Sequence, residues 1–236
     1  MSAIKNCQGL RRALPQPKDR AGMSGIHWHR AEVDPDASWL VATNGHYLLR
    51  ALAPFPGPSE GRTIAAAYLG SREGCHGPML PWVKEPLCAL ALAKAQRIPE
   101  QCFPDYTMIL PDWKPLSHAM TEIDPKALKA FLRAHGTKKG SFDAYRITVG
   151  GDDAPETFDI APWFMADIAW PEGSVVFDVA YLIKILGFFD QKKPVEMRVK
   201  TGRRGAFEPL APFEFRQGES QTGEPLRQAI LMPRRE

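Results

Sequence analysis

Hydrophobic positions recur along this chain with two periods, one typical of amphipathic helices and one of half-buried strands. The first helical pattern predicts a helix over residues 2–14, which Pro15 and Pro17 end. Its apolar face is formed by Ile4, Cys7, Leu10 and Leu14. Its polar face carries Lys5, Gln8 and Arg12 at i, i+3 and i+7, with Arg11 at the edge.

Strand patterns follow in the next part of the chain, over residues 26–32, 38–42 and 47–51. The Asn44-Gly45 pair between the last two supplies the positive φ values that a tight hairpin turn needs. Residues 63–69 and 87–96 fit either a helix or a small-residue strand.

A second helix is predicted from Asp124, because Asp-Pro provides an N-cap followed by proline at N1, and Gly136 closes it. Its apolar face consists of Ala127, Leu128, Phe131 and Leu132. On the opposite side Lys126, Lys129 and Arg133 repeat the spacing of Lys5, Gln8 and Arg12, which hints at an internal duplication.

A third helix begins near Asp178, after a strand over residues 174–177, and Pro194 marks its predicted end. Residues 195–200 alternate as a strand, residues 217–223 form a polar loop, and residues 228–232 form the last strand. Both halves therefore look like α+β units. We predict one domain over residues 1–102 and another over residues 103–236.

Composition is that of a folded protein: 44% of the 236 residues are hydrophobic and 10% are aromatic. No window approaches the roughly 20 apolar residues of a membrane span, and no secretory signal is recognisable, so we expect a cytoplasmic protein. The four cysteines form no Cys-x-x-Cys pair, so neither a zinc ribbon nor a disulfide framework is indicated, and free thiols are the simplest interpretation.

Charge is nearly balanced: residues 1–100 carry 12 lysines and arginines against 8 acidic residues, and residues 101–236 carry 18 against 19. Contact with nucleic acid would therefore come from local stripes. The two helical stripes can meet phosphates without reading bases, and the candidate DNA-binding residues are Lys5, Arg11, Arg12, Lys126, Lys129 and Arg133. The alternative is that these are ordinary solvated faces.

Catalytic signals are absent from the sequence: it holds no nucleophile elbow, zinc-protease, phosphate-loop or dinucleotide-binding motif, so we expect no enzyme activity and no cofactor. His27 and His29 share one strand face and could chelate a metal with His46 or His76 in a metal-dependent hydrolase. No carboxylate or thiol lies at ligand spacing beside them, which favours packed or exposed imidazoles instead.

Four segments occur in an order that resembles a known family. Residues 41–49 read Val-Ala-Thr-Asn-Gly-His-Tyr-Leu-Leu; residues 103–106 read Phe-Pro-Asp-Tyr, with Ile-Leu-Pro at 109–111; residues 176–182 read Val-Phe-Asp-Val-Ala-Tyr-Leu; and Met232-Pro233 lie near the end. They are similar to Ala-Thr-Asp-Gly-His-Arg-Leu-Ala, Phe-Pro-Asp-Tyr…Leu-Pro, Phe-Asn-x-x-Tyr-Leu and the terminal Met-Pro of the bacterial DNA polymerase III beta sliding clamp family. The resemblance covers that family's second and third domains.

The resemblance implies two DNA-clamp modules, each with helices packed on small antiparallel sheets, with one helix of the first module near residues 63–69 and a strand at residues 87–96. It implies a noncatalytic processivity factor that encircles double-stranded DNA and tethers a polymerase or another DNA enzyme, with a possible clamp loader. Since family rings hold six modules, two modules per chain imply a homotrimer. The short length suggests a phage or mobile-element origin. The alternative is a non-encircling adaptor or decoy that binds clamp-interacting peptides.

The family also binds partner peptides in an apolar pocket between its last two domains. Carried over, the pocket would comprise Met23, Thr43, Gly45, His46, Tyr47, Leu48, Pro104, Met108, Ile109, Ile230, Met232, Pro233 and Arg234. This chain departs from the family pattern at Asn44, where the family has Asp, and at Tyr47, where it has Arg. Replacing Leu48 with Asp is expected to abolish peptide binding and to spare DNA retention.

Overall fold

The computed structural model describes Leu10 and residues 25–54, 62–65, 103, 105–110, 118–136, 138–143, 145–151, 153–160, 174–200 and 212–234. The chain forms two compact units, unit 1 with Met1–Asp105 and Gly218–Gln228, and unit 2 with Tyr106–Gln217 and Ala229–Glu236. The predicted boundary after residue 102 lies close to this division, but the segment Gly218–Gln228 was expected in the second half. Outside the described residues lie residues 87–96, the helix over residues 2–14 except Leu10, and Lys5, Arg11, Arg12, Met23 and Pro104.

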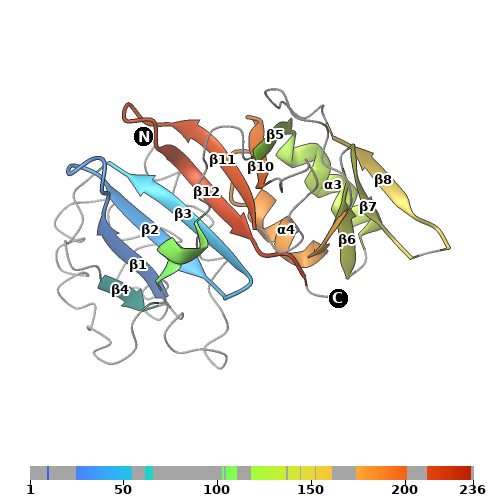
Figure 1. Ribbon diagram of the computed structural model, residues 1–236, viewed down its shortest axis with the longest axis horizontal. Helices are drawn as coiled ribbons and strands as arrows, with labels where there is room; N and C mark the ends of the chain where they lie inside the picture. The colour runs from blue at the N-terminus through green and yellow to red at the C-terminus, as the bar shows by residue number, and fades with distance from the viewer. Residues whose placement is uncertain are drawn as a thin grey trace, which may run out of the picture. The chain divides into compact units, whose positions relative to one another are not determined.

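Unit 1 is an antiparallel sheet (Figure 1). Its strands are β1 (Gly25–Arg30), β2 (Ser38–Thr43), β3 (Tyr47–Ala53), β4 (Arg62–Ala65) and the first residues of β12 (Pro225–Leu231). They lie in the order β4-β1-β2-β3-β12. Both faces are covered, since every residue of β2 is buried.

The hairpin between β2 and β3 confirms the turn predicted at Asn44-Gly45. Gly45 has a φ of 86°, and the Asn44 side chain accepts hydrogen bonds from the backbone N–H groups of His46 (3.0 Å) and Tyr47 (3.1 Å). The Thr43 hydroxyl donates to the carbonyl of Tyr47 at 2.8 Å. These contacts fix the register in which Thr43 lies opposite Leu48.

The helix that the family resemblance implies near residues 63–69 is wrong over residues 63–65. Residues 62–65 form β4, which pairs antiparallel with β1, with Ile64 opposite Ile26 and Thr63 opposite His27. The β-branched Thr63 and Ile64 suit an extended backbone, and pairing with β1 satisfies its polar groups.

Unit 2 combines two helices with antiparallel strands, so the predicted α+β class is confirmed. Its elements are η5 (Tyr106–Ile109), β5 (His118–Ile123), α3 (Pro125–His135), β6 (Lys139–Phe142), β7 (Arg146–Val149), β8 (Glu156–Asp159), β9 (Val175–Asp178), α4 (Val179–Leu186), β10 (Val195–Lys200), β11 (Phe213–Glu219) and the end of β12. One set of strands has the order β8-β7-β6-β9, and another has the order β11-β10-β5.

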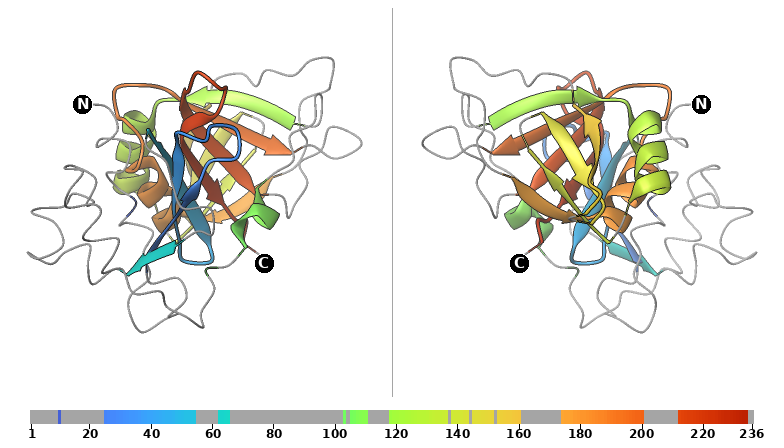
Figure 2. Two further views of the ribbon diagram at one scale, coloured as in Figure 1. Left: turned by 90° about the vertical axis from the view of Figure 1, so that its left-hand side faces the viewer. Right: turned by 90° about the vertical axis from the view of Figure 1, so that its right-hand side faces the viewer.

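Helix α3 starts and ends where the sequence predicts. The Asp124 carboxylate accepts hydrogen bonds from the N–H groups of Lys126 (2.8 Å) and Ala127 (3.1 Å), and Gly136 follows the last turn. Gly136 has an extended backbone, and a Cβ there would lie 2.1 Å from the carbonyl oxygen of Leu132 and 2.7 Å from Cγ1 of Val179 in α4. Glycine is therefore needed first because the last turn of α3 itself leaves no room for a side chain, and second because α4 lies close by. Figures 1 and 2 show α3 and α4 side by side.

Helix α4 starts at its predicted N-cap but ends earlier than expected. Asp178 caps it, with its carboxylate 2.9 Å from the N–H of Ala180, and Gly187 closes the last turn by donating to the carbonyl of Ile183. The prediction that the helix runs to Pro194 is wrong, because the chain turns at Gly187 and the following residues form a loop.

The polar loop predicted over residues 217–223 is also partly wrong. Strand β11 continues to Glu219, and the turn is confined to residues 220–223. Gln217 is a buried strand residue whose side-chain amide bonds to the chain before β10, at the carbonyls of Asp190 (2.9 Å) and Lys193 (3.0 Å). The polar character of Gln217 suggests a loop in the sequence, because the partners that allow it to be buried in a strand lie 23 to 27 residues away.

Candidate nucleic-acid interface

The exposed face of α3 carries three cations. Pro125, Leu128 and Leu132 are buried, which turns Lys126 and Arg133 to the solvent, while Lys129 is half-buried at the flank. The spacing i, i+3 and i+7 predicted from the sequence therefore becomes one row along the helix. Three of the six candidate DNA-binding residues are brought together in this way.

Helix α4, which packs against α3, adds a cation that sequence reasoning missed. Lys184 is exposed, with its ammonium 5.9 Å from the centre of the Tyr181 ring. Neither helix contains an acidic residue between its first and last residues. No local signal in the sequence marks Lys184, because its place beside the cations of α3 follows only from the packing of the two helices.

Several of these cations lack an anionic partner. Elsewhere in unit 2, Arg146 pairs with Asp143 at 3.1 Å and Arg216 lies 3.9 Å from Glu214. Within the part of the chain that the structure describes, no carboxylate oxygen lies within 4 Å of the side chains of Lys126, Arg133 or Lys184. Uncompensated cations on neighbouring helices attract a polyanion without distinguishing its sequence.

The predicted peptide-binding residues of unit 1 do not share one environment. Gly45 and His46 are exposed at the turn, and Thr43 is 4% exposed. Tyr47 is 1% and Leu48 0% exposed, so both belong to the core of the unit. Successive residues of a strand point to opposite faces, so Tyr47 and Leu48 cannot line the same surface.

In unit 2 the predicted peptide-binding residues lie on η5 and on the last part of the chain. Met108 is 83% exposed and Ile109 is half-buried, whereas Ile230 is buried in β12. The half-buried residues after β12 are Met232, Pro233 and Arg234. The backbone N–H of Arg234 donates to the carbonyl of Val176 at 2.8 Å, which holds this segment against β9. A pocket built from both units stays a prediction.

The two histidines of β1 are packed within unit 1. The His27 ring stacks on Phe103 with centroids 4.8 Å apart and lies 5.4 Å from His29. Burial, and then the charge of His29, lowers the pKa of His27 to about 4, and burial also lowers the pKa of His29. Among the described residues no three His, Cys, Asp or Glu side chains gather as metal ligands. The arrangement therefore favours packed imidazoles over the metal hypothesis for His27, His29 and His46.

Stability should fall as the pH drops from about 6.5 to 4, because unfolded His27 takes up a proton at its ordinary pKa of 6.5 while folded His27 resists until about 4. Protonation in this window favours the unfolded chain. Allowing for the solvent contact of the half-buried ring, we expect a loss of about 2 kcal/mol in the free energy of unfolding. Urea denaturation at several pH values measures it. In H27F, which keeps a ring against Phe103, the loss should be smaller; equal slopes for both proteins would contradict the assignment.

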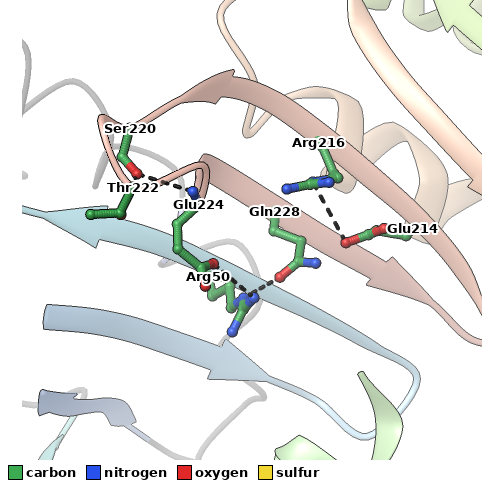
Figure 3. A network of polar contacts seen from close by, with 7 residues as sticks. All are labelled: Arg50, Glu214, Arg216, Ser220, Thr222, Glu224 and Gln228. Carbon is green, nitrogen blue, oxygen red and sulfur yellow. Dashed lines mark hydrogen bonds and ion pairs between the residues drawn. The ribbon is translucent and has the colours of Figure 1, made fainter. Parts of the chain in front are cut away.

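A polar network in unit 1 was not predicted from the sequence. The Arg50 guanidinium lies 4.0 Å from the centre of the Trp39 ring and contacts Gln228 and Glu224, the latter at 3.9 Å (Figure 3). Ser220 accepts a hydrogen bond from the N–H of Glu224 at 3.1 Å. Arg50 thus adds a side-chain connection to the backbone pairing of β3 with β12, through which this late segment belongs to unit 1.

No helix among the described residues is long and apolar enough to cross a membrane. A scan against protein-family models and a search of curated proteins found no match.

Solved structures do match. A DnaN sliding clamp (DNA polymerase III subunit beta) of Bartonella birtlesii, bound to griselimycin, has a TM-score of 0.64 at 16% identity, over 99% of this chain and 64% of that one. Caulobacter crescentus pol III beta has a TM-score of 0.63 at 17% identity, over 100% and 64%. The beta subunit of Streptococcus pyogenes has a TM-score of 0.62 at 15% identity, over 98% and 63%. The chain thus spans slightly less than two thirds of the length of each, and its fold is that of part of a bacterial DNA polymerase III beta sliding clamp.

Proposed function

We propose that this protein is a noncatalytic DNA sliding clamp that encircles duplex DNA and tethers a DNA polymerase or another DNA enzyme. The observation that carries the proposal is the pair of packed helices in unit 2 whose charged residues are all cations. Together with the sliding-clamp fold, it supports contact with the phosphate backbone. Such contact holds a protein on DNA of any sequence and lets it slide.

Tethering would use the apolar surface that the resemblance implies. Met108, at 83% exposure, and half-buried Ile109, Met232 and Pro233 support a peptide-binding role for unit 2. A short apolar peptide from a polymerase would cover such side chains. The two clamps solved with griselimycin bound, from Bartonella birtlesii and Pseudomonas aeruginosa, make this compound a direct probe of ligand binding by the present chain.

Encirclement requires several copies of the chain, and a trimer would supply six modules. Strand β8 ends one set of strands in unit 2, and its Glu156, Thr157 and Asp159 are exposed. A strand at the end of a sheet can pair with a strand of another copy, and charged side chains limit such pairing to a complementary partner.

Retention on DNA tests the proposal. Protein bound to a closed circular duplex should stay bound through gel filtration at about 0.15 M salt and should be released when the circle is cut once. Rings of this family can need a clamp loader to close around DNA. The protein is therefore placed on the circle in two ways, by mixing the folded protein with DNA and by diluting denatured protein into a solution of the DNA. Equal loss from circular and linear DNA would contradict encirclement.

The alternative is a non-encircling adaptor or decoy that binds clamp-interacting peptides, which the exposure of Met108 also fits. Light scattering distinguishes the two functions, since a chain of 26.3 kDa that remains a monomer cannot enclose a duplex. A monomer that binds griselimycin would support the adaptor, and a trimer would support the clamp.

A further inference from the structure

The backbone of the loop between α4 and β10, residues 190–194, is hydrogen-bonded by two glutamine side chains. Gln217 of β11 accepts a hydrogen bond from the N–H of Asp190 at 2.8 Å and donates to the carbonyls of Asp190 and Lys193. Gln191 donates to the carbonyls of Leu186 (2.7 Å) and Phe189 (2.9 Å). A loop whose backbone groups are hydrogen-bonded in this way fixes the points from which its other side chains extend.

Those other side chains are two adjacent lysines. Lys192 and Lys193 are exposed, and among the described residues no carboxylate oxygen lies within 4 Å of either ammonium group. The N–H of Lys192 donates to the Asp190 carboxylate at 3.1 Å, so this acidic side chain fixes the backbone of the turn. The loop therefore carries two lysines whose ammonium groups have no carboxylate within 4 Å among the described residues, and with Asp190 its net charge is +1.

The lysines lie beside the first turn of α3. A groove of about 410 Å³ is lined by Glu122, Ile123, Asp124, Pro125, Gln191, Lys192, Lys193 and Pro194. It places the loop next to the end of the helix at which the exposed Lys126 begins the row of cations. Figure 2 shows the same neighbourhood from two sides, with the orange loop after α4 at one end of α3.

The charges of the groove indicate the class of ligand. Glu122 and Asp124 lie on its α3 side, so a small anion entering the groove would meet two carboxylates as well as two ammonium groups. Both carboxylates are exposed, and that of Asp124 also accepts hydrogen bonds from two N–H groups of α3. A polyanion that passes over the edge of the groove can contact the two lysines without approaching the two carboxylates. This favours a nucleic-acid backbone as the ligand over a free phosphate ion.

We propose that Lys192 and Lys193 contact the phosphate backbone of duplex DNA, next to the cationic row of α3, and that Gln217 is the residue that positions them. The proposal rests on the proposed function. It adds a loop contact to the helices and accounts for the buried glutamine that braces a surface loop.

Binding of a fluorescent duplex oligonucleotide at a series of salt concentrations tests it. In K192A/K193A the slope of log K against log salt should be smaller in magnitude by about 2, since each phosphate contact contributes roughly 0.9. K192R/K193R should keep the wild-type slope. If the wild-type chain does not bind the duplex, the proposed function fails. Suppose instead that the wild-type chain binds the duplex, that K126A/R133A reduces the salt slope, and that K192A/K193A does not. The proposed function then stands, and the proposed contact by the loop lysines is contradicted.

Gln217 is tested by a double-mutant cycle. Q217E keeps the acceptor for the N–H of Asp190 and removes the amide donors, so it should weaken DNA binding while the lysines are present. In the K192A/K193A background the same change should have no further effect on DNA binding. An equal loss in both backgrounds would mean that Gln217 acts only through general stability. Circular dichroism of each variant verifies that it is folded. Inorganic phosphate at millimolar concentration should not compete with the duplex for binding to the wild-type protein.

Discussion

Reversing two charges on α3, in K126E/R133E, is expected to lower the affinity for duplex DNA on the order of 100-fold at about 0.1 M salt. Both side chains are exposed and lack an ion-pair partner among the described residues, so the change removes no contact that stabilises the fold. It replaces attraction to two phosphates with repulsion. The effect should grow as the salt is lowered, since screening weakens with it.

The measurement is the same salt series on a fluorescent duplex, with a control that reverses as many charges elsewhere. R30E/R146E alters one exposed cation in each unit, neither of them on α3 or α4. Because R146E also breaks the ion pair of Arg146 with Asp143, circular dichroism verifies that this control is folded before its affinity is compared. Its affinity should stay within a few-fold of the wild-type value. If both double variants lose affinity equally, the attraction depends on net charge, and the helices are not the contact surface.

Local signals explain why α3 was predicted well. Asp124 caps the helix through its own side chain, and the buried positions Leu128 and Leu132 show the helical period directly in the sequence. The hairpin at Asn44-Gly45 was predictable for the same reason, because its hydrogen bonds join residues at most four apart. Structure that depends on neighbours in sequence can be recognised from the sequence alone.

Long-range pairing explains what was not predicted. Gln217 in β11 bonds to the loop after α4, and its partners lie 23 to 27 residues away. The strand at residues 62–65 depends on pairing with β1, and the segment Gly218–Gln228 belongs to unit 1 because β12 pairs with β3, with Arg50 contacting Gln228 178 residues away. No periodicity encodes such contacts, so propensity and family analogy were the only guides there.

The residues of the candidate site were predictable where one helix carries them and not where several elements contribute. The row of Lys126, Lys129 and Arg133 was predicted because one helix carries it. Lys184 and the loop lysines Lys192 and Lys193 were missed, since their relation to that row arises only when α4 and its loop pack beside α3. A surface assembled from several elements is visible only after folding.

Replacing Leu48 with Asp should destabilise unit 1 instead of selectively abolishing peptide binding. Leu48 is 0% exposed in β3, so the substitution removes a buried aliphatic side chain and puts a carboxylate in its place. Loss of the buried methyl groups alone costs about 2–5 kcal/mol, and the desolvated carboxylate adds to it. A total of about 4 kcal/mol or more is comparable to the whole stability of an ordinary domain. The sequence-based expectation that L48D spares DNA retention is therefore replaced.

Urea denaturation of L48D and H46D distinguishes a core position from a surface position on the same hairpin. His46 is exposed beside Gly45, so H46D should unfold within about 0.5 kcal/mol of the wild-type protein. A wild-type midpoint for L48D would contradict the burial of Leu48. Peptide or griselimycin binding is then better tested in H46D and M108D, because Met108 is 83% exposed and its replacement leaves the core intact. A loss of binding in these folded variants can be attributed to the surface, which no result with L48D could establish.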